Sequence, residues 1–290
     1  WPLSRSWGYN MDIFSRVGEI IASDRGGRKV STLFRPWYLS EALALMEKPG
    51  RTAVVTGFFV QACSAPETDG PGGAVILGRA LRKCGHDVTL FTDGLCCDVL
   101  RACSGAVGGP DVMEASSAGD ILSWRPDLVI FIERLGRAAD GKYYNMRGED
   151  VSKTAAPLDG AALEPKRARS LAVGDGGNEA GMGNFRVPLS ELLPSYAPCL
   201  SVVRADAALP VDVSDWGGYA IASLLSLGRP EWIGPGEQDL HLMLEAMVRA
   251  GAVDGVTRRG EPTVDGFPVG VHEQVVRSLK EAVTSPVGLS

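Results

Sequence analysis

A turn with the sequence GDGGNE, which directly follows an apolar run, carries the residue types best suited to chemistry. Two carboxylates four residues apart, Asp175 and Glu179, have the amide of Asn178 between them. Such groups can coordinate a hard divalent cation through oxygen or hold a pair for proton transfer. Gly176 and Gly177 are expected to leave backbone N–H groups free to bind a ligand. The alternative is an ordinary glycine-rich turn in which Asp175 only caps the backbone.

A second candidate loop, residues 56–74, places Glu67 and Asp69 just before glycines at the start of a helix. Glycines there allow close backbone approach, and the N–H groups of a helix start form an anion site. Either carboxylate could serve as a base if burial raises its pKa. The alternative is that Asp69 is a helix cap, with Pro71 at the first helical position. The dinucleotide fingerprint G-x-G-x-x-G is absent between strand and helix, and no organic cofactor is expected.

The third loop, residues 132–152, concentrates guanidinium, phenol and amide groups within a short stretch. Such a set is suited to fixing a small polar ligand that bears carboxylates. The alternative is a solvated loop held together by salt bridges. The candidate ligand-binding residues of this loop are Arg134, Arg137, Tyr143, Tyr144, Asn145 and Arg147.

The oxygen donors of Asp175, Asn178 and Glu179 favour Mg²⁺, Mn²⁺ or Ca²⁺ over zinc or copper, because no His or Cys stands in this turn. Haloacid-dehalogenase phosphatases carry a similar turn, GDG-x-ND, that holds Mg²⁺. They also need a D-x-D-x-T/V nucleophile after an earlier strand, and FTDGL at 91–95 is the nearest approach to it in this chain. A metal-dependent hydrolase or phosphatase of another type is therefore an alternative function.

Short β-branched runs with glycine or acidic residues at their carboxyl ends indicate buried parallel strands. Segments with helical spacing separate them, which is typical of an α/β fold: a doubly wound, mostly parallel sheet with helices on both faces. Ligands of such sheets bind outside the carboxyl ends of the strands, so the three candidate loops should meet at one cleft. The expected strands are 51–57, 86–93, 127–133, 169–175 and 199–206.

Residues 1–48 precede the first expected strand and carry two expected helices, at about 11–23 and 38–47. We interpret this segment as an N-terminal helical extension packed on the core. A Pro-Gly pair marks the join with the remainder of the chain. Residues 49–290 are then expected to form a single α/β domain.

The composition excludes several classes of protein. Of 290 residues, 45% are hydrophobic and 22% charged, so the chain can bury a sizeable core. The net charge of −6 argues against nucleic-acid partners. The longest mostly apolar stretch, 219–227, is far shorter than the roughly 20 residues that a bilayer requires, so no membrane association is expected. Six cysteines without a C-x-x-C pair fit an intracellular compartment, the cytoplasm or the mitochondrial matrix. The sequence does not set the oligomeric state.

Five segments combine glycine, tyrosine and acidic residues in specific patterns. They are PETDGPGGA (66–74), IERLGRAADGKYYNMRGED (132–150), APLD (156–159), VGDGGNEAGMG (173–183) and DGVTRRGEPTVDGFP (254–268). Taken together, and in this order, they resemble the D-glutamate cyclase C-terminal domain family, from about residue 10 to residue 285. The resemblance implies an α/β fold and a carbon–oxygen lyase (a hydro-lyase). It also implies the substrate: D-glutamate, or a close acidic amino-acid analogue, would be converted to 5-oxo-D-proline and water.

The candidate residues suit this reaction. Cyclisation requires an ammonium group to lose its proton, the nitrogen to attack the distal carboxylate carbon, and an oxygen to leave as water. Glu67 or Asp69 could act as the base, and the 174–179 turn could supply metal ligands or N–H donors for the developing charge. An arginine of the third loop would hold the α-carboxylate of this small acidic amino acid. A non-catalytic metabolite-binding module is a further alternative, because a glycine-rich loop beside a parallel sheet also occurs in such proteins.

Overall fold

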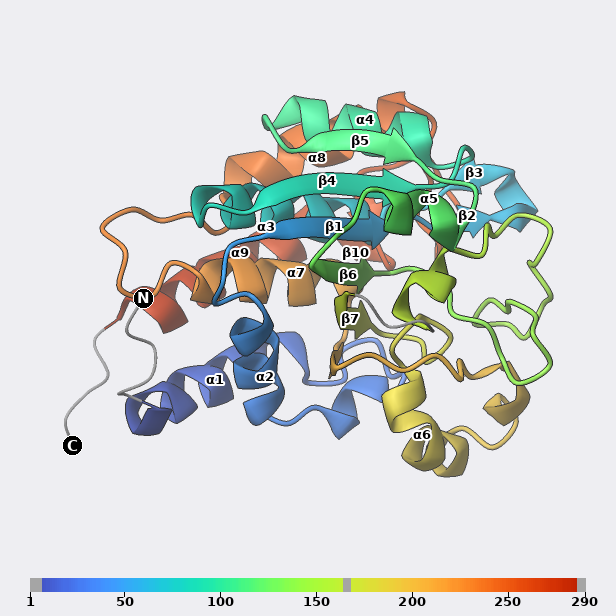
Figure 1. Ribbon diagram of the computed structural model, residues 1–290, viewed down its shortest axis with the longest axis horizontal. Helices are drawn as coiled ribbons and strands as arrows, with labels where there is room; N and C mark the ends of the chain where they lie inside the picture. Colours follow the sequence, from blue (N-terminus) through green and yellow to red (C-terminus); the bar gives the residue numbers. More distant parts are fainter. Residues whose placement is uncertain (1–6, 164–167, 286–290) are drawn as a thin grey trace.

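The computed structural model describes residues 7–163 and 168–285 and centres on a six-stranded sheet (Figure 1). All strand pairs of this sheet are parallel, in the order β5-β4-β1-β6-β7-β8. Helices pack on both faces, so the expected doubly wound α/β fold is confirmed. The strands are β1 (Arg51–Thr56), β4 (Asp87–Thr92), β5 (Asp111–Glu114), β6 (Leu128–Ile132), β7 (Arg169–Gly174) and β8 (Ala207–Pro210).

Strands β1, β4, β6 and β7 confirm four of the five expected strands, but the fifth expectation is wrong. Residues 199–206 form no strand, and β8 follows them. This segment lies instead along the turn after β7, where the Ser201 N–H donates to the Gly177 carbonyl (2.9 Å) and the Gly181 N–H donates to the Val203 carbonyl (2.9 Å). Strand β5 was not expected, because this edge strand is mostly exposed and lacks an apolar run.

Helices α3 and α7 pack on one face of the sheet, where most of the longer helices lie (Figure 1). The other face carries the short helices α5 and α6 and several single turns of 3₁₀ helix. The helices are α1 (Trp7–Ile21), α2 (Trp37–Leu45), α3 (Pro71–Lys83), α4 (Cys97–Ala106), α5 (Ala118–Ser123), α6 (Arg186–Leu192), α7 (Ser214–Leu224), α8 (Glu237–Arg249) and α9 (Val269–Thr284). The 3₁₀ helices are η2 (Val30–Leu33), η3 (Gln61–Cys63), η4 (Leu158–Ala162), η5 (Gly183–Phe185) and η6 (Ala197–Cys199). The two-residue strands are β2 (Phe59–Val60), β3 (Ala65–Pro66), β9 (Thr263–Val264) and β10 (Phe267–Pro268).

The two expected N-terminal helices form as α1 and α2, with their ends shifted by a few residues from the expected ranges. Phe14 in α1 and Leu39 in α2 are buried in the same hydrophobic cluster as the apolar residues of α7 and α9. Helix α2 also contacts β7 and β8. The N-terminal segment therefore contributes to the main core, and a domain boundary at residue 48 stays a prediction.

Helices α3 and α7 approach so closely that their backbones touch. A Cβ atom on Gly73 would lie 2.9 Å from the backbone of Asp215, and one on Gly218 would lie 2.7 Å from the backbone of Gly73. Only glycine fits at these two positions without a shift of one helix. The contact brings the first turn of α7 against the first turn of α3, at the carboxyl edge of the sheet.

The strand order reverses between β1 and β6, which are neighbours in the middle of the sheet. The chain leaves β1 toward α3 on one face and leaves β6 into a long loop on the other (Figure 1). In open parallel sheets, ligands bind in the crevice that such a reversal opens at the carboxyl ends of the strands. The topology therefore favours a site between the loops that follow β1 and β6.

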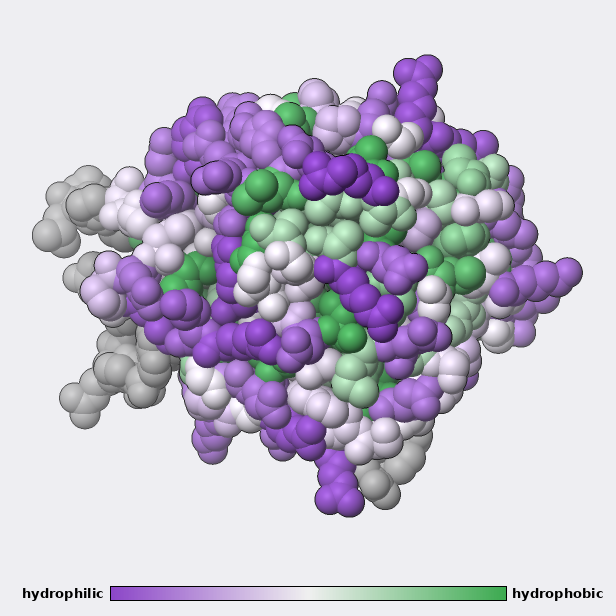
Figure 2. Space-filling view, turned by 90° about the horizontal axis from the view of Figure 1, so that it is seen from above, coloured by the Kyte–Doolittle hydropathy of each residue, from purple (hydrophilic) through white to green (hydrophobic). Residues whose placement is uncertain are grey.

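Within the described residues, no helix is both long and apolar enough to cross a bilayer. Figure 2 shows hydrophilic and apolar residues interspersed on the face that carries α4 and β5. Single exposed apolar side chains such as Leu95 and Met113 are ordinary on a folded protein.

Candidate active site

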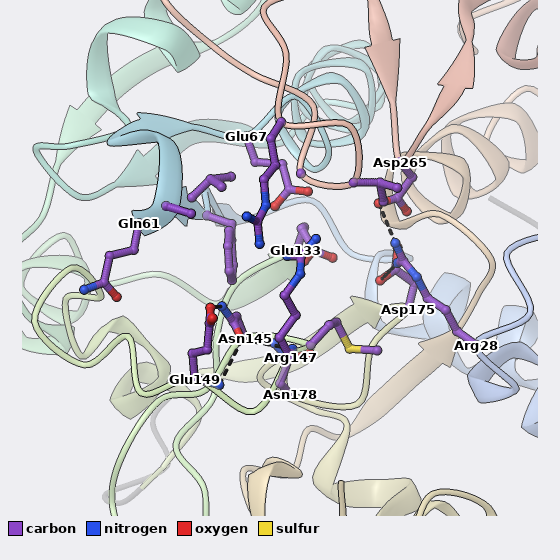
Figure 3. Close-up of a pocket in the computed structure, with 17 residues that line it drawn as sticks. Arg28, Gln61, Glu67, Glu133, Asn145, Arg147, Glu149, Asp175, Asn178 and Asp265 are labelled. Carbon is purple, nitrogen blue, oxygen red and sulfur yellow. Dashed lines mark hydrogen bonds and ion pairs between the residues drawn. The ribbon is translucent and has the colours of Figure 1, made fainter.

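A cavity of about 230 Å³ lies at the carboxyl edge of the sheet (Figure 3). Residues from all three candidate loops line it, as the sequence predicted. Pockets for drug-sized ligands measure roughly 300–1,000 Å³, so this cavity suits a smaller metabolite. Figure 3 shows Glu67 and Asp265 in the upper part of the view, Glu133 at its centre, and Asn145 and Arg147 below Glu133. The polar and charged lining residues are Arg28, Gln61, Glu67, Glu133, Asn145, Arg147, Glu149, Asp175, Asn178, Arg258 and Asp265.

Several buried acids line this pocket or lie in an acid group next to it. Burial raises the pKa of Glu67 to about 8, and the neighbouring Asp265 carboxylate adds to the rise. Burial, together with the Asp175 carboxylate, raises the pKa of Glu133 well above its usual value. Burial and the charge of Asp265 raise the pKa of Asp69 in the same way. Carboxyl groups in such surroundings hold protons near neutral pH unless a cation balances them.

Arg28 supplies positive charge to two further buried acids at this pocket, Asp175 and Asp265. Its Nη1 atom lies 2.5 Å from Asp175 Oδ1 and its Nη2 atom 2.6 Å from Asp265 Oδ1. The side chains of the two acids are only 2% and 4% exposed, whereas that of Arg28 is 21% exposed toward the pocket. The guanidinium opposes the rise in the pKa of Asp175 that burial causes. Arg28 thus bridges the end of β7 and the turn between β9 and β10.

The turn after β7 is organised by Glu179. Its Oε1 atom accepts hydrogen bonds from the N–H groups of Asp175 (3.2 Å) and Gly176 (2.6 Å), and its Oε2 atom accepts one from Gly177 (2.8 Å). These three amides therefore point at the chain's own carboxylate. The expectation that Gly176 and Gly177 leave their N–H groups free for a ligand is wrong in this structure. Gly177 adopts a φ of +89°, a conformation that favours glycine.

The long loop after β6 brings three polar side chains to the pocket, those of Asn145, Arg147 and Glu149. Asn145 Oδ1 accepts hydrogen bonds from the N–H groups of Arg147 (2.9 Å) and Glu149 (3.0 Å), which shapes a tight turn. This turn presents Arg147 to the pocket (Figure 3). Within residues 7–163 and 168–285, the Arg147 guanidinium has no hydrogen-bond or ion-pair partner. Asn178 is tied to the loop through its Nδ2 atom, which donates to the Tyr144 carbonyl (2.8 Å).

Two groups of three acids have the spacing of metal ligands. Asp69, Asp175 and Asp265 form one group, and Glu133, Asp175 and Glu179 form the other. Within each group the ligand oxygens lie within 4.8 Å of one another. In the part of the chain that the structure describes, buried Oδ1 of Asn178 and Oδ2 of Asp265 have no hydrogen-bond partner. These clusters could hold a hard cation through oxygen ligands alone.

The sequence as a whole decides the family. A model of the D-glutamate cyclase-like C-terminal family matches residues 17–280. The chain belongs to this family.

Known proteins similar to this D-glutamate cyclase-like chain include a human enzyme. The mitochondrial D-glutamate cyclase of Homo sapiens is 29% identical over 322 aligned positions, which cover 92% of this chain and 51% of the human protein. The chain thus spans about half the length of the curated relative it matches. Among solved structures, an exopolyphosphatase-related protein from Bacteroides fragilis matches with a TM-score of 0.44 and 8% identity, over 89% of this chain and 63% of that protein.

Among the expected ligand-binding residues of this D-glutamate cyclase-like domain that do not line the cavity are Arg134, Arg137 and Tyr143, all from the loop after β6. Arg134 is buried and donates from Nη1 to Asp93 Oδ2 (2.6 Å) and from Nη2 to the Ala156 carbonyl (2.7 Å). Arg137 makes a bidentate ion pair with Asp159, in which Nε donates to Oδ2 (2.9 Å) and Nη2 donates to Oδ1 (3.1 Å). The Tyr143 hydroxyl donates to the same Asp159 carboxylate (2.6 Å). In this structure their polar groups hold the long loop together.

Tyr144 is likewise occupied within the loop, because its hydroxyl donates to Asp140 Oδ2 (2.6 Å). Asp69 and Glu179 do not line the cavity, but each belongs to a metal-spaced group that contains Asp175. The predicted site residues that line the cavity itself are Glu67, Asn145, Arg147, Asp175 and Asn178.

The pocket lining includes charged residues for which the sequence pattern indicated no role, among them Arg28, Glu133, Arg258 and Asp265. Glu133, Arg258 and Asp265 have φ angles of 46°, 60° and 54°, a left-handed conformation that costs a non-glycine residue about 1–2 kcal/mol. Strain of this kind gathers at functional sites. The only sequence signal for Asp265 and Arg258 was their presence in the 254–268 segment, and Arg28 had none.

Proposed function

We propose that this chain is a hydro-lyase that converts D-glutamate, or a close acidic amino-acid analogue, to 5-oxo-D-proline and water. Membership of the family and the likeness to the human enzyme support the reaction class. The observation that carries the proposal is the composition of the pocket. Arginines without a partner in the described chain line the same cavity as buried acids whose pKa values are raised.

The proposed reaction needs groups that move protons and groups that hold carboxylates. The substrate nitrogen gives up two protons in total, forms a bond to the side-chain carboxylate carbon, and one oxygen of that carboxylate leaves with both protons as water. An ionised Glu67 is suited to take the first proton, because burial makes it a stronger base than an ordinary carboxylate. A protonated Glu133 is suited to donate toward the leaving oxygen.

The two carboxylates of the substrate need cationic partners. Arg147 and Arg258 line the cavity from different loops, and within the described residues neither guanidinium has a hydrogen-bond or ion-pair partner. Guanidinium groups bind carboxylates through paired hydrogen bonds. We assign one substrate carboxylate to each arginine, which sets the preference for a dicarboxylic amino acid.

A divalent cation, Mg²⁺, Mn²⁺ or Ca²⁺, fits the proposal. Asp175 belongs to both metal-spaced groups, and the unpartnered oxygens of Asn178 and Asp265 lie at the same pocket. When bound, the cation would stabilise negative charge that develops on the attacked carboxylate. The ligands we propose are Asp69, Asp175 and Asp265.

The acid groups also favour a second candidate function, a metal-dependent hydrolase or phosphatase, since cations held by carboxylates activate water in many such enzymes. A non-catalytic metabolite-binding module is the remaining alternative. Location in the cytoplasm or mitochondrial matrix is part of the proposal.

Incubation of the purified chain with D-glutamate, L-glutamate or a general phosphate ester, each with Mn²⁺ or with EDTA, separates these functions. Chiral chromatography measures 5-oxo-D-proline, and a phosphate assay measures hydrolysis. The proposal predicts 5-oxo-D-proline from D-glutamate and no 5-oxo-L-proline from L-glutamate, since cyclisation leaves the configuration of the α-carbon unchanged. Phosphate release without lactam formation would favour the hydrolase. Binding of D-glutamate without turnover would favour the binding module.

A further inference from the structure

Arg28 is distant in sequence from the two acids with which it pairs, Asp175 and Asp265. It lies between α1 and η2, whereas Asp175 follows β7 and Asp265 lies between β9 and β10. Its two terminal nitrogens each pair with one of these acids, at 2.5 and 2.6 Å. Figure 3 shows the Arg28 side chain entering beside both acids at one end of the pocket.

The same two acids, together with Asp69, form one of the metal-spaced groups. The ligand oxygens of this group lie within 4.8 Å of one another. A cation with oxygen ligands at about 2.0–2.6 Å holds its ligand oxygens at similar separations. The Oδ2 atom of Asp265 is buried and has no hydrogen-bond partner in the described ranges, so it offers a lone pair to a further cation. Arg28 and a divalent cation therefore compete for the same two carboxylates.

We propose that Arg28 is the resident counter-ion of this acid group, and that a divalent cation bound by Asp69, Asp175 and Asp265 displaces its guanidinium, which then adds a second cationic partner to one of the substrate carboxylates held by Arg147 and Arg258. Arg28 already lines the pocket, so its released donors face the ligand. The identity of the substrate rests on the proposed function, whereas the competition with a cation does not. Cation binding frees the Arg28 guanidinium, and the dicarboxylate binds this guanidinium. The binding of the cation and the binding of the dicarboxylate therefore strengthen each other.

The competition between Arg28 and a cation can be tested by measuring Mn²⁺ affinity. The loss of the EPR signal of free Mn²⁺ reports how much of the ion is bound. Arg28→Met removes the charge, Arg28→Lys keeps it, and Arg147→Met is the matched control that removes a pocket arginine with no acid partner in the described chain. We expect Arg28→Met to bind Mn²⁺ at least about tenfold more tightly than the wild type, because a dication no longer displaces or repels a nearby guanidinium. Arg28→Lys and Arg147→Met should each change the affinity less than about threefold.

Arg28→Met leaves two buried acids without a counter-ion, so its folding must be followed as well. We expect this variant to melt earlier than the wild type in EDTA and to gain more thermal stability from Mn²⁺. If Arg28→Met does not fold, Arg28→Gln and the ordering of Mn²⁺ affinities, Arg28→Gln above Arg28→Lys, provide the same test. Equal Mn²⁺ affinity in the wild type and the charge-removing variant, or no Mn²⁺ binding at all, overturns the proposal.

Glutarate, an unreactive dicarboxylate, tests the coupling without any turnover. Calorimetry should show glutarate binding the wild type at least about fivefold more tightly in Mg²⁺ than in EDTA, and this gain should disappear in Arg28→Met. A gain that persists in Arg28→Met would contradict a carboxylate-binding role for Arg28. D-glutamate turnover, measured in the same preparations, distinguishes a failure of the proposed function from a failure of this inference. Lactam formation without cation competition supports only the proposed function, and competition without lactam formation supports only the inference.

Discussion

Asp69 and Asp215 cap each other's helices. The Asp215 N–H, in the first turn of α7, donates to Asp69 Oδ1 (2.9 Å). In return, Asp215 Oδ1 accepts hydrogen bonds from the N–H groups of Gly70 (3.0 Å) and Gly73 (2.6 Å) at the start of α3. The N–H groups that the sequence suggested as an anion site are thus occupied by a carboxylate of another helix. This exchange fixes the acid group at the carboxyl edge of the sheet.

Asp215→Ala should destabilise the protein substantially. It removes the acceptor of three buried hydrogen bonds, two from backbone N–H groups and one from the Tyr219 hydroxyl, and leaves the N–H groups unsatisfied, at a cost of about 3 kcal/mol in the free energy of unfolding. Urea denaturation followed by circular dichroism measures the loss. Asp120→Ala, which removes an exposed cap of α5, is the control and should cost less. Equal losses in the two variants would contradict a structural role for the exchange.

Glu179→Gln should chiefly lower the free energy of unfolding, and it should not act on turnover directly. The amide keeps one acceptor oxygen but turns an NH₂ group toward the backbone N–H groups of the turn, which costs about 1–3 kcal/mol. Glu149→Gln is the control, because Glu149 lines the same pocket but is exposed. An unchanged unfolding midpoint together with complete loss of turnover would instead assign Glu179 a direct part in the reaction.

Arg147→Ala should chiefly raise KM for D-glutamate, by roughly 10- to 150-fold, because a charge-assisted contact with the substrate is lost. Its guanidinium is exposed, so the melting temperature should hardly change. Arg137→Ala is the matched comparison, since Arg137 pairs with Asp159 away from the cavity. It should lower the melting temperature while the folded enzyme keeps its KM. The opposite pattern would mean that Arg137 binds substrate and Arg147 does not.

Stability should fall as the pH rises when no divalent cation is present. The pKa of Glu67 is raised by burial to about 8 and that of Asp215 to about 7, so the folded state binds protons that the unfolded chain has released. The stabilisation is complete below about pH 4, the range of the unfolded pKa values, and is lost as the pH rises through about 7–8. Thermal melts in EDTA at about pH 6 and pH 8.5 should show the lower midpoint at the higher pH. Mn²⁺ should shrink the difference, and a higher midpoint at the higher pH in EDTA would contradict this account of the acids.

The sequence predicted the sheet because its central strands are apolar on both faces, and it predicted the convergence of the three loops because parallel strands end at one edge. It could not predict β5, whose exposed edge position leaves no apolar pattern. Nor could it separate Arg147 from Arg134 and Arg137, since three arginines in one loop look alike until their partners are known. Arg134 and Arg137 face Asp93 and Asp159, which lie 41 and 22 residues away in the chain. The sequence could not indicate a role for Arg28, because only the tertiary fold brings it to Asp175.

The most direct test of the proposed site is the turnover of D-glutamate by the wild type and by Glu67→Gln, measured as 5-oxo-D-proline by chiral chromatography. The substituted amide has the shape of the protonated Glu67 side chain, so the variant should fold. Thermal melts check this, with Glu149→Gln as the control variant. We predict that the wild type forms 5-oxo-D-proline and that Glu67→Gln lowers kcat by about 10²- to 10⁴-fold, the usual contribution of a general base. Full activity in a folded Glu67→Gln variant, or no lactam from the wild type, would contradict the account.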